Sequence, residues 1–362
     1  MTIRRNKMKT LNVGVIGIGV IATTKHIPNL LKREDVKITM LCDLDTAKAE
    51  KAKEDLSLTD AVVCADYKEV CTNPDIDVVH VCTANPSHYE ISMLAMNNGK
   101  HVYCEKPMAL TYKEAKEMCD TAKAKGVKLT SGTQWRYNPA PMRMKEMVEN
   151  GEFGDIYYVK SSQLRPRRLP AYGVYTSKAG NGGGVLLDGG PHSIDLPMWL
   201  TNNYDVKSVY GVTFDKMKNF PEGNDLGPWD PKHFDVEDTA FAMITMKNGM
   251  VIYMETAWAT NLQQSAIGVV AEIGGNKAGA DMVGPGFENH VRTTKIADGK
   301  LTTSTEKIEE PMNMNEYDLM HWIDAIQTDG NPLILPEQQA VVVRVIEAIY
   351  KSAATGQVVY FD

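Results

Sequence analysis

The chain has 362 residues, of which 43% are hydrophobic and 23% are charged, and its formal net charge at pH 7 is -7. This length predicts two domains, with enough apolar residues for two buried cores. An acidic chain has no surplus of lysine and arginine to neutralise phosphates, which excludes nucleic acid and anionic membranes as expected partners and favours a small-molecule substrate.

The cysteines and the hydropathy of the sequence indicate the cellular compartment that we expect for the protein. The six cysteines lie in the first third of the sequence without metal-ligand spacing: Cys42, Cys64, Cys71, Cys82, Cys104 and Cys119. We expect buried free thiols in a reducing cytoplasm and no bound metal. No stretch approaches the roughly 18 consecutive apolar residues that a membrane helix needs, so we expect no membrane span.

The first predicted elements are a strand, a glycine-rich turn, a helix and a second strand. An apolar run over Val13–Ile16 leads directly into Gly17-Ile18-Gly19-Val20-Ile21-Ala22. A second apolar run over residues 36–41 follows and is succeeded by Asp43. This order is typical of a dinucleotide-binding βαβ unit.

Each small residue of this turn has a physical task. Gly17 permits a tight turn, Gly19 lets the backbone approach a pyrophosphate, and Ala22 allows the helix to pack closely on the strand. Asp43 stands about 20 residues further on, where a carboxylate binds the ribose hydroxyls and repels a 2′-phosphate. We therefore expect NAD(H) as cofactor, and it is left open whether it is released in each turnover. The expected contacts of the turn are Gly17, Gly19, Val20, Ile21 and Asp43.

Strand and helix continue to alternate as far as residue 130. The pattern predicts strands over residues 61–64, 77–82, 100–104 and 127–130 and helices over residues 46–55, 89–97 and 111–124. Six strands with helical crossovers predict an α/β fold with a parallel, doubly wound Rossmann sheet. Ligands of such sheets lie at the carboxyl ends of the strands, so the loops after Val81, Cys104 and Thr130 should surround the cofactor.

A shift in composition near Trp135–Pro141 predicts a domain boundary, with residues 1–134 as the NAD-binding domain and residues 135–362 as a substrate-binding and oligomerisation domain. The second half predicts strands over residues 156–164, 206–214, 238–246, 250–258 and 266–273 and helices over 142–149, 191–200, 316–328 and 337–354. This is an α+β domain with a large, mostly antiparallel open sheet, and its C-terminal helices are able to pack back on the first domain.

Two of these strands are apolar on both faces. In Val251–Trp258 and Phe241–Met246 both alternation phases are largely apolar. A sheet of this kind needs a cover on each face, and the few predicted helices can supply only one. We therefore expect a homodimer or a higher homo-oligomer formed through this sheet.

Three later motifs, together with the glycine turn, resemble the Gfo/Idh/MocA family of glucose-fructose oxidoreductases and inositol dehydrogenases. They are Glu105-Lys106-Pro107, the stretch over residues 182–195 and Trp199. Their order and spacing cover nearly the whole chain. The resemblance implies NAD-dependent oxidation of a secondary hydroxyl of a sugar, glycoside or cyclic polyol. The stretch 182–195 is similar to members that oxidise the C3 hydroxyl of a glucosyl unit to a ketone.

By this resemblance Lys106, Asp188 and His192 are the catalytic residues, and all three also contact the substrate. Proline disfavours helix at the residue before it, so Lys106 should stay extended at the end of its strand, and the peptide before Pro107 is a candidate for the cis form. Asp188 and His192 are four residues apart at the start of a predicted helix, which places them on one face. The alternatives are an ordinary surface lysine and a helix cap beside an unremarkable histidine, and for Asp195 a structural role is equally open.

The resemblance also implies further contacts to the cofactor and the substrate. The cofactor contacts are Thr83, Asn85 and His88 in the loop after the fourth strand, Glu105 and Lys106 after the fifth, and Arg136. Tyr137 or Asn138 is a further substrate contact by the same resemblance. Arg165 is a substrate contact for a different reason: with Arg167 and Arg168 it ends a predicted strand, and such a group of guanidiniums can bind a phosphate or carboxylate of a substrate. The alternatives are turn and cap roles for the loop, structural packing for residues 134–139, and a solvated loop for Arg165, Arg167 and Arg168.

Two other features of the second half are ambiguous. His233, Asp235, Glu237 and Asp238 are ligand-type residues, but they are better explained as the polar entry to a strand than as a metal site. Trp229, within the insertion over residues 221–234, forms either an aromatic wall for an aglycone or part of a surface loop.

Two further functions remain open on the same fold. One is a redox-assisted glycoside hydrolase, in which transient oxidation at C3 acidifies C2 and drives elimination. The other is a non-catalytic sensor of sugars or dinucleotides, against which the presence of Lys106, Asp188 and His192 argues.

Overall fold

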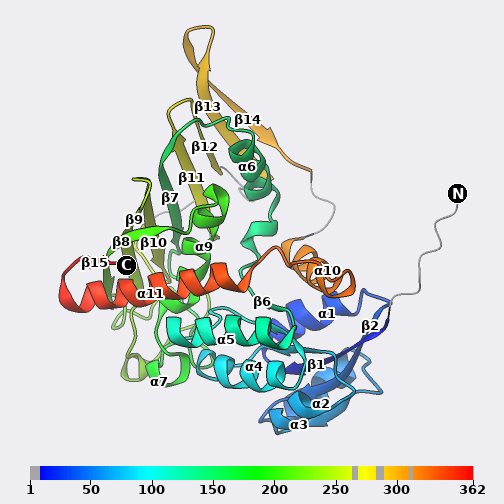
Figure 1. Cartoon of the computed structure of the whole chain (residues 1–362). Helices are drawn as coiled ribbons and strands as arrows, with labels where there is room; N and C mark the ends of the chain where they lie inside the picture. The colour runs from blue at the N-terminus through cyan, green and yellow to red at the C-terminus, as the bar shows by residue number, and fades with distance from the viewer. Residues whose placement is uncertain (1–8, 263–267, 283–288, 310–312, 362) are drawn as a thin grey trace, which may run out of the picture. The chain divides into compact units, whose positions relative to one another are not determined.

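The computed structural model describes residues 9–262, 268–282, 289–309 and 313–361 (Figure 1). The chain divides into two compact units, residues 1–132 with 315–340 and residues 133–314 with 341–362. The first unit therefore takes a segment from near the C-terminus in addition to the N-terminal part. None of the helices in the described ranges is both long enough and apolar enough to cross a membrane.

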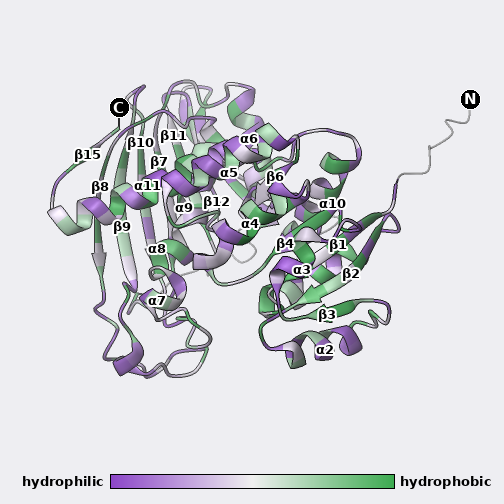
Figure 2. Cartoon of the chain, turned by 60° about the horizontal axis from the view of Figure 1, so that its bottom comes forward, coloured by the Kyte–Doolittle hydropathy of each residue, from purple (hydrophilic) through white to green (hydrophobic). Residues whose placement is uncertain are grey.

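The first unit contains a six-stranded parallel sheet with the strand order β3-β2-β1-β4-β5-β6, which confirms the predicted doubly wound sheet. Its strands are β1 (Leu11–Ile16), β2 (Val36–Cys42), β3 (Val62–Cys64), β4 (Val78–Val81), β5 (His101–Cys104) and β6 (Leu129–Ser131). Almost all residues of the central strands β1 and β4 are buried, because helices cover both faces of a parallel sheet (Figure 2).

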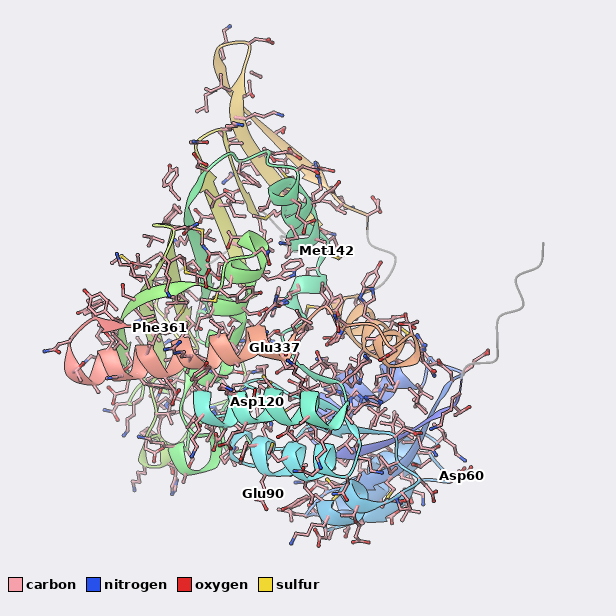
Figure 3. The ribbon with its side chains drawn as sticks, viewed as in Figure 1. Asp60, Glu90, Asp120, Met142, Glu337 and Phe361 are labelled. Carbon is pink, nitrogen blue, oxygen red and sulfur yellow. The ribbon has the colours of Figure 1, made fainter. Side chains whose placement is uncertain are left out.

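The helices of this unit are α2 (Thr46–Asp55), α3 (Tyr67–Thr72), α4 (His88–Asn97), α5 (Tyr112–Lys125) and α10 (Met314–Gln327). The segment after the glycine turn is a π-helix, Ala22–His26, followed by the short α1 (Ile27–Leu30). Helices α4 and α5 lie side by side, with Glu90 and Asp120 labelled on them in Figure 3. The sequence predicted α2 with the same bounds but did not predict α3.

Helix α10 belongs to the first unit because its apolar face completes that unit's core. Leu319 and Trp322 are buried in one cluster with Val13 of β1 and Leu41 of β2. Burial of two large side chains of this kind stabilises the packing by a few kcal/mol. The predicted helix over residues 316–328 is thus confirmed as an element.

The second unit contains a nine-stranded sheet with the strand order β14-β13-β12-β11-β7-β10-β9-β8-β15. Its strands are β7 (Ile156–Leu164), β8 (Val206–Phe214), β9 (Thr239–Met246), β10 (Val251–Ala257), β11 (Val270–Gly275), β12 (Ala278–Met282), β13 (His290–Ala297), β14 (Lys300–Lys307) and β15 (Val359–Tyr360). Among the strands of the described residues, β7 and β10 are the only pair of this sheet that is parallel, so the predicted mostly antiparallel sheet is confirmed.

The helices of this unit are α6 (Pro139–Glu149), α7 (Lys178–Asn181), α8 (Val185–Asp188), α9 (Gly190–Thr201) and most of α11 (Pro336–Thr355). Helix α9 is buried over nearly its whole length and packs on β7 and β10. The strand predicted from Ala266 begins at Val270, and its first two residues lie outside the described part. Strands β12 to β15 were not predicted.

Candidate functional site

The glycine turn of the first unit has the geometry that a dinucleotide requires. Gly17 has φ +88°, and a Cβ there would lie 2.7 Å from the backbone carbonyl of Cys82, so only glycine fits. At Gly19 no described residue other than its two chain neighbours has a heavy atom within 4 Å of the place of a Cβ, which leaves room for a phosphate. Asp43 lies beside the turn, because its Oδ2 accepts a hydrogen bond of 2.8 Å from the N–H of Ile18. These residues fit the adenosine half of NAD.

The loop after β4 is held to the segment after β5 by His88. Its Nδ1 lies 2.8 Å from the carbonyl of Pro107, and its Nε2 lies 3.0 Å from the carbonyl of Thr83. Burial lowers the pKa of this fully buried histidine, and a neutral ring has one N–H to donate to either carbonyl. These contacts support the structural alternative for His88, while cofactor contacts of the half-buried Thr83 and Asn85 stay predictions.

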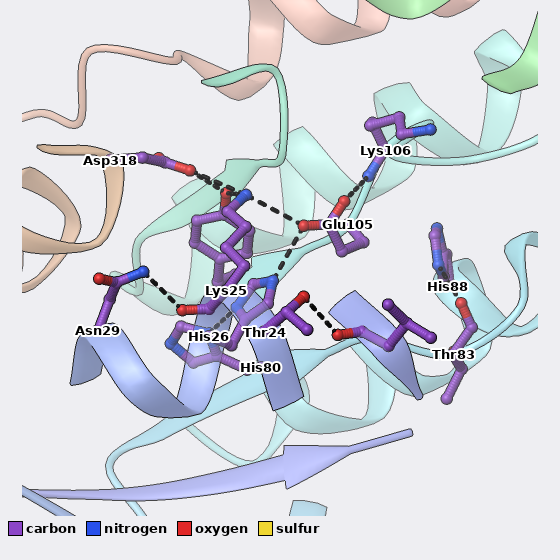
Figure 4. A network of polar contacts seen from close by, with 12 residues as sticks. Thr24, Lys25, His26, Asn29, His80, Thr83, His88, Glu105, Lys106 and Asp318 are labelled. Carbon is purple, nitrogen blue, oxygen red and sulfur yellow. Dashed lines mark hydrogen bonds and ion pairs between the residues drawn. The ribbon is translucent and has the colours of Figure 1, made fainter. Parts of the chain in front are cut away.

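Lys106 directly follows β5, and the Lys106–Pro107 peptide is cis, as the resemblance suggested. Its backbone N–H donates a hydrogen bond of 3.2 Å to Oε2 of Glu105. Oε1 of Glu105 is bound by Lys25 Nζ at 3.1 Å and His26 Nε2 at 2.9 Å (Figure 4). Both oxygens of the Glu105 carboxylate therefore accept hydrogen bonds from residues of the first unit, and the predicted contact of Glu105 to the cofactor stays untested.

Asp188 and His192 lie at a junction of two helices in the second unit, where the sequence predicted the start of one. Asp188 ends α8, His192 lies in the first turn of α9, and Gly189 joins them. A Cβ at Gly189 would lie 2.5 Å from both Gln163 Oε1 and Thr256 Oγ1, so glycine is needed for α9 to approach the sheet. His192 is 6% exposed, and its ring lies 6.5 Å from that of Trp135.

The carboxylate of Asp188 contacts Trp258 and Arg165. Trp258 Nε1–H donates a hydrogen bond of 2.7 Å to Oδ2, and Arg165 Nη1 lies 3.5 Å from the same oxygen. Trp258 comes directly after β10 and is fully buried. From the sequence, Trp258 was predicted only as an apolar residue of a strand. A buried tryptophan needs a hydrogen-bond acceptor for its N–H, and this requirement was the signal in the sequence that could have indicated a polar partner for Trp258.

Glu237, one of the four polar residues before β9, caps the helix that carries Asp188. Its carboxylate accepts hydrogen bonds from the N–H groups of Gly184 and Leu186, each at 3.0 Å, and from Tyr350 Oη at 2.8 Å. Burial raises the pKa of Glu237. No group of three or more histidine, cysteine, aspartate and glutamate residues within the described ranges could hold a metal ion.

Arg136 forms an internal ion pair in the second unit. The Arg136 and Asp195 side chains are 0% and 1% exposed, and Arg136 Nε donates to Asp195 Oδ2 at 2.8 Å. Its Nη2 also lies 3.3 Å from Tyr204 Oη. These contacts support the structural alternative for both residues of the pair, and the cofactor contact of Arg136 stays a prediction. Tyr137, the predicted substrate contact, is 2% exposed.

The three arginines after β7 have separate partners. Arg165 faces Asp188, whereas Arg167 donates to the carbonyl of Phe220 at 2.7 Å and Arg168 lies 3.7 Å from Asp225. The second and third arginines therefore stabilise a loop, which was the alternative explanation. The substrate contact of Arg165 stays a prediction.

A row of aromatic side chains begins beside Asp188. It does not come from the insertion over residues 221–234, in which Trp229 was the candidate for an aromatic wall. Trp229 is 4% exposed, and its Nε1–H donates to the carbonyl of Lys218 at 2.7 Å, so it belongs to the interior of its loop. Instead, the rings of Trp258 and Tyr175 lie 6.4 Å apart, and those of Tyr175 and Tyr172 lie 5.7 Å apart. Tyr172, at the outer end of the row, is 50% exposed.

Comparison with known proteins agrees with this geometry. Residues 11–133 match the NAD-binding Rossmann domain of an oxidoreductase family, Gfo/Idh/MocA, and residues 145–361 match its C-terminal alpha/beta domain. The chain is 33% identical over 348 residues to D-glucoside 3-dehydrogenase of Escherichia coli K12, covering 96% of each chain. It is also 33% identical over 194 residues to inositol 2-dehydrogenase/D-chiro-inositol 3-dehydrogenase of Lactiplantibacillus plantarum, covering 53% of this chain and 52% of the relative.

Solved structures share the whole fold. Levoglucosan dehydrogenase in complex with NADH and levoglucosan superposes with a TM-score of 0.83 at 22% identity, covering 97% of this chain and 99% of the other. Aldose-aldose oxidoreductase of Caulobacter crescentus gives a TM-score of 0.79 at 24% identity, covering 98% and 100%. Both domain matches and the full-length relative lead to one conclusion: the chain belongs to the Gfo/Idh/MocA family of NAD-binding oxidoreductases.

Proposed function

We propose that this protein oxidises the C3 hydroxyl of the glucosyl unit of a glycoside, with NAD as the acceptor, and yields a 3-keto glycoside. The observation that carries the proposal is the identity of 33% to a D-glucoside 3-dehydrogenase over 96% of both chains. The presence of Lys106, Asp188 and His192 in the family's motifs supports a catalytic protein over a sensor.

Oxidation of a secondary alcohol removes a proton from oxygen and a hydride from carbon. In our proposal His192 takes the hydroxyl proton as general base, and the Lys106 ammonium stabilises negative charge on the same oxygen. Asp188, fixed by Trp258 and Arg165, accepts a hydrogen bond from a neighbouring hydroxyl. NAD, when bound at Gly17, Gly19 and Asp43, supplies the hydride acceptor.

The aromatic row supports a glycoside over a free polyol. Ligand sites orient a substrate with a few polar groups and bury its apolar surface against aromatic rings. Asp188 supplies the polar group here, and Trp258, Tyr175 and Tyr172 lead outward from it. A glucosyl ring at Asp188 would place its aglycone along this row.

We further propose that the protein forms a homodimer through the nine-stranded sheet. Tyr210, Met243 and Tyr253 face one another across β8, β9 and β10, and they are 40%, 49% and 37% exposed. The same row continues into Lys160 and Glu272 on β7 and β11. A surface row with an exposed apolar half and a half-buried charged half can pair with its own copy about a two-fold axis.

The cytoplasm is the proposed location. All six cysteines are buried and free, and thiols persist in this form where the compartment is reducing. The burial of Cys42 and Cys104 raises the pKa of both thiols, so neither is poised as a nucleophile.

The test is a panel of alkyl and aryl glucosides, free glucose and inositols, assayed for NADH formation with mass spectrometry of the products. NADH formed together with a glycoside lighter by two hydrogens supports the proposal. Release of the aglycone without net NADH would identify the redox-assisted hydrolase instead. NAD binding without turnover of any member of the panel would identify a sensor.

A further inference from the structure

A buried polar cluster lies behind Lys106 in the first unit and is not explained by the proposed chemistry. We call it the Lys25 cluster, and its members, Lys25, His26, His80, Tyr103, Glu105 and Asp318, are each at most 6% exposed (Figure 4). They come from the π-helix after the glycine turn, from β4, from the end of β5 and from α10. Residues this polar are rarely buried unless they are paired and have a role.

Lys25 is the centre of the cluster. Its ammonium lies 3.1 Å from Glu105 Oε1 and 3.0 Å from Asp318 Oδ2, and it donates to Tyr103 Oη at 2.7 Å. Burial alone would lower the pKa of Lys25, but the two carboxylates raise it above its usual value. Lys25 is therefore a charged lysine in the interior, balanced by carboxylates that are more than 200 residues apart in sequence.

The two histidines form a hydrogen-bonded chain with a defined direction. A carboxylate can only accept, so His26 Nε2–H donates to Glu105 Oε1 at 2.9 Å. Burial lowers the pKa of His26, and in the neutral ring Nδ1 is then an acceptor, so His80 Nδ1–H donates to it at 2.8 Å. The chain thus runs from His80 through His26 to Glu105.

Lys25 and His26 both bind the carboxylate of Glu105. Burial would raise the pKa of this carboxyl, but Lys25, His26 and Lys106 hold it well below its usual range. The space it occupies is shaped for it, because a Cβ at Gly132 would lie 2.6 Å from Oε2. That oxygen accepts the N–H of Lys106 at 3.2 Å, and this bond connects the cluster to the proposed catalytic lysine.

Stability by itself is a poor explanation for such a cluster. A buried ion pair is often no more stabilising than well-packed apolar residues, since desolvation of both charges offsets their attraction. An apolar side chain can fill the same position without the free-energy cost of removing a charge from water. The cluster ends at the backbone of Lys106, where orientation matters for catalysis.

We propose that Lys25 is a positioning residue, which fixes the Glu105 carboxylate and through it the backbone and side chain of Lys106. His26 supports this arrangement by binding Glu105, and Asp318 supports it by binding Lys25. The inference deepens the proposed function and rests on the catalytic role assigned there to Lys106.

The principal test compares Lys25→Met with Lys100→Met. Lys100 is a matched control, because it is 5% exposed in the same unit but its ammonium donates to the backbone carbonyls of Asn73 and Ile76 and not to a carboxylate of the described residues. We expect Lys25→Met to lower kcat by about 10-fold or more while the Kd for NAD changes less than about 3-fold, since a positioning defect acts on the chemical step. Lys100→Met should keep the wild-type kcat.

The pH profile separates positioning from mere loss of stability. The titratable groups around Glu105 are Lys25, His26, His80, Cys82, His88, Tyr103, Cys104, Lys106 and Asp318. Without Lys25, burial dominates and Glu105 takes up a proton at higher pH, so the acid limb of kcat/KM, which the proposed base His192 sets in the wild type, should move to higher pH. In a Glu105→Gln background only His192 sets this limb, so adding Lys25→Met should leave the limb in place and lower kcat no further. Additive losses, or an acid limb that stays in place in the single variant Lys25→Met, would overturn the proposal.

A substrate-free measurement keeps the inference separate from the proposed function. Labelling of Lys106 by an amine-reactive reagent, followed by peptide mass spectrometry, reports its environment with or without turnover. We expect Lys25→Met to change the Lys106 labelling rate at least about 3-fold, with the exposed Lys51 as internal standard. If Lys25→Met does not fold, Glu105→Gln, which leaves Lys25 balanced by Asp318, is measured in the same way. Unchanged labelling in the folded variant refutes the inference, whereas inactivity of the wild type on every glycoside refutes only the proposed function.

Discussion

Replacement of Trp258 by phenylalanine tests how Asp188 is held. The change keeps a buried aromatic ring beside Tyr175 but removes the N–H that donates to Asp188 Oδ2 at 2.7 Å. A hydrogen bond to a charged group contributes about 1.5–3 kcal/mol. About 1.4 kcal/mol corresponds to a factor of ten in rate, so full loss would lower kcat/KM by about 10- to 100-fold. The Asp188 side chain is 12% exposed and Arg165 is still near it, so we expect the lower end, about 10-fold.

The assay is steady-state oxidation of the best glucoside, with Trp229→Phe as a matched control. Trp229 also donates one N–H bond of 2.7 Å in the second unit, but to the backbone carbonyl of Lys218. The control should lose comparable thermal stability and keep kcat/KM within about 2-fold, because its partner is not at Asp188. Equal kcat/KM for the two variants would refute the role of Trp258 in holding Asp188.

Three further predictions concern catalysis, cofactor choice and assembly. Lys106→Ala and His192→Ala should each lower turnover on the order of 10²-fold with little change in NAD affinity, and near-normal turnover of Lys106→Ala would contradict the mechanism. The rise of activity with pH should flatten in His192→Ala, because in the wild type a protonated imidazole cannot accept the proton of the hydroxyl. Asp43→Ala should narrow the preference for NAD over NADP in binding titrations, and equal affinities in the wild type would show that Asp43 has no such role. Light scattering should give a particle larger than the 40.1 kDa chain, and Met243→Glu should reduce it to the monomer; a monomeric wild type at micromolar concentration would exclude the dimer.

The sequence by itself determined the elements whose patterns are local. Alternating apolar runs and helical segments predicted the six parallel strands, and α2 (Thr46–Asp55) was predicted with its observed bounds. The glycine turn was readable because Gly17 and Asp43 meet requirements that act within one βαβ unit. Strands β13 and β14 were not readable, since their residues are mostly exposed and carry no apolar alternation.

Only the tertiary structure decided which side chains meet. Asp318 reaches Lys25 because α10 returns to the core of the first unit, and Trp258 reaches Asp188 because β10 ends beside the junction of α8 and α9. Arg136 pairs with Asp195 for the same kind of reason. Periodicity records which face of an element is buried, but a contact between distant segments depends on how those elements pack. The sequence therefore located the residues of the proposed chemistry, whereas the groups that hold them in place came from the fold.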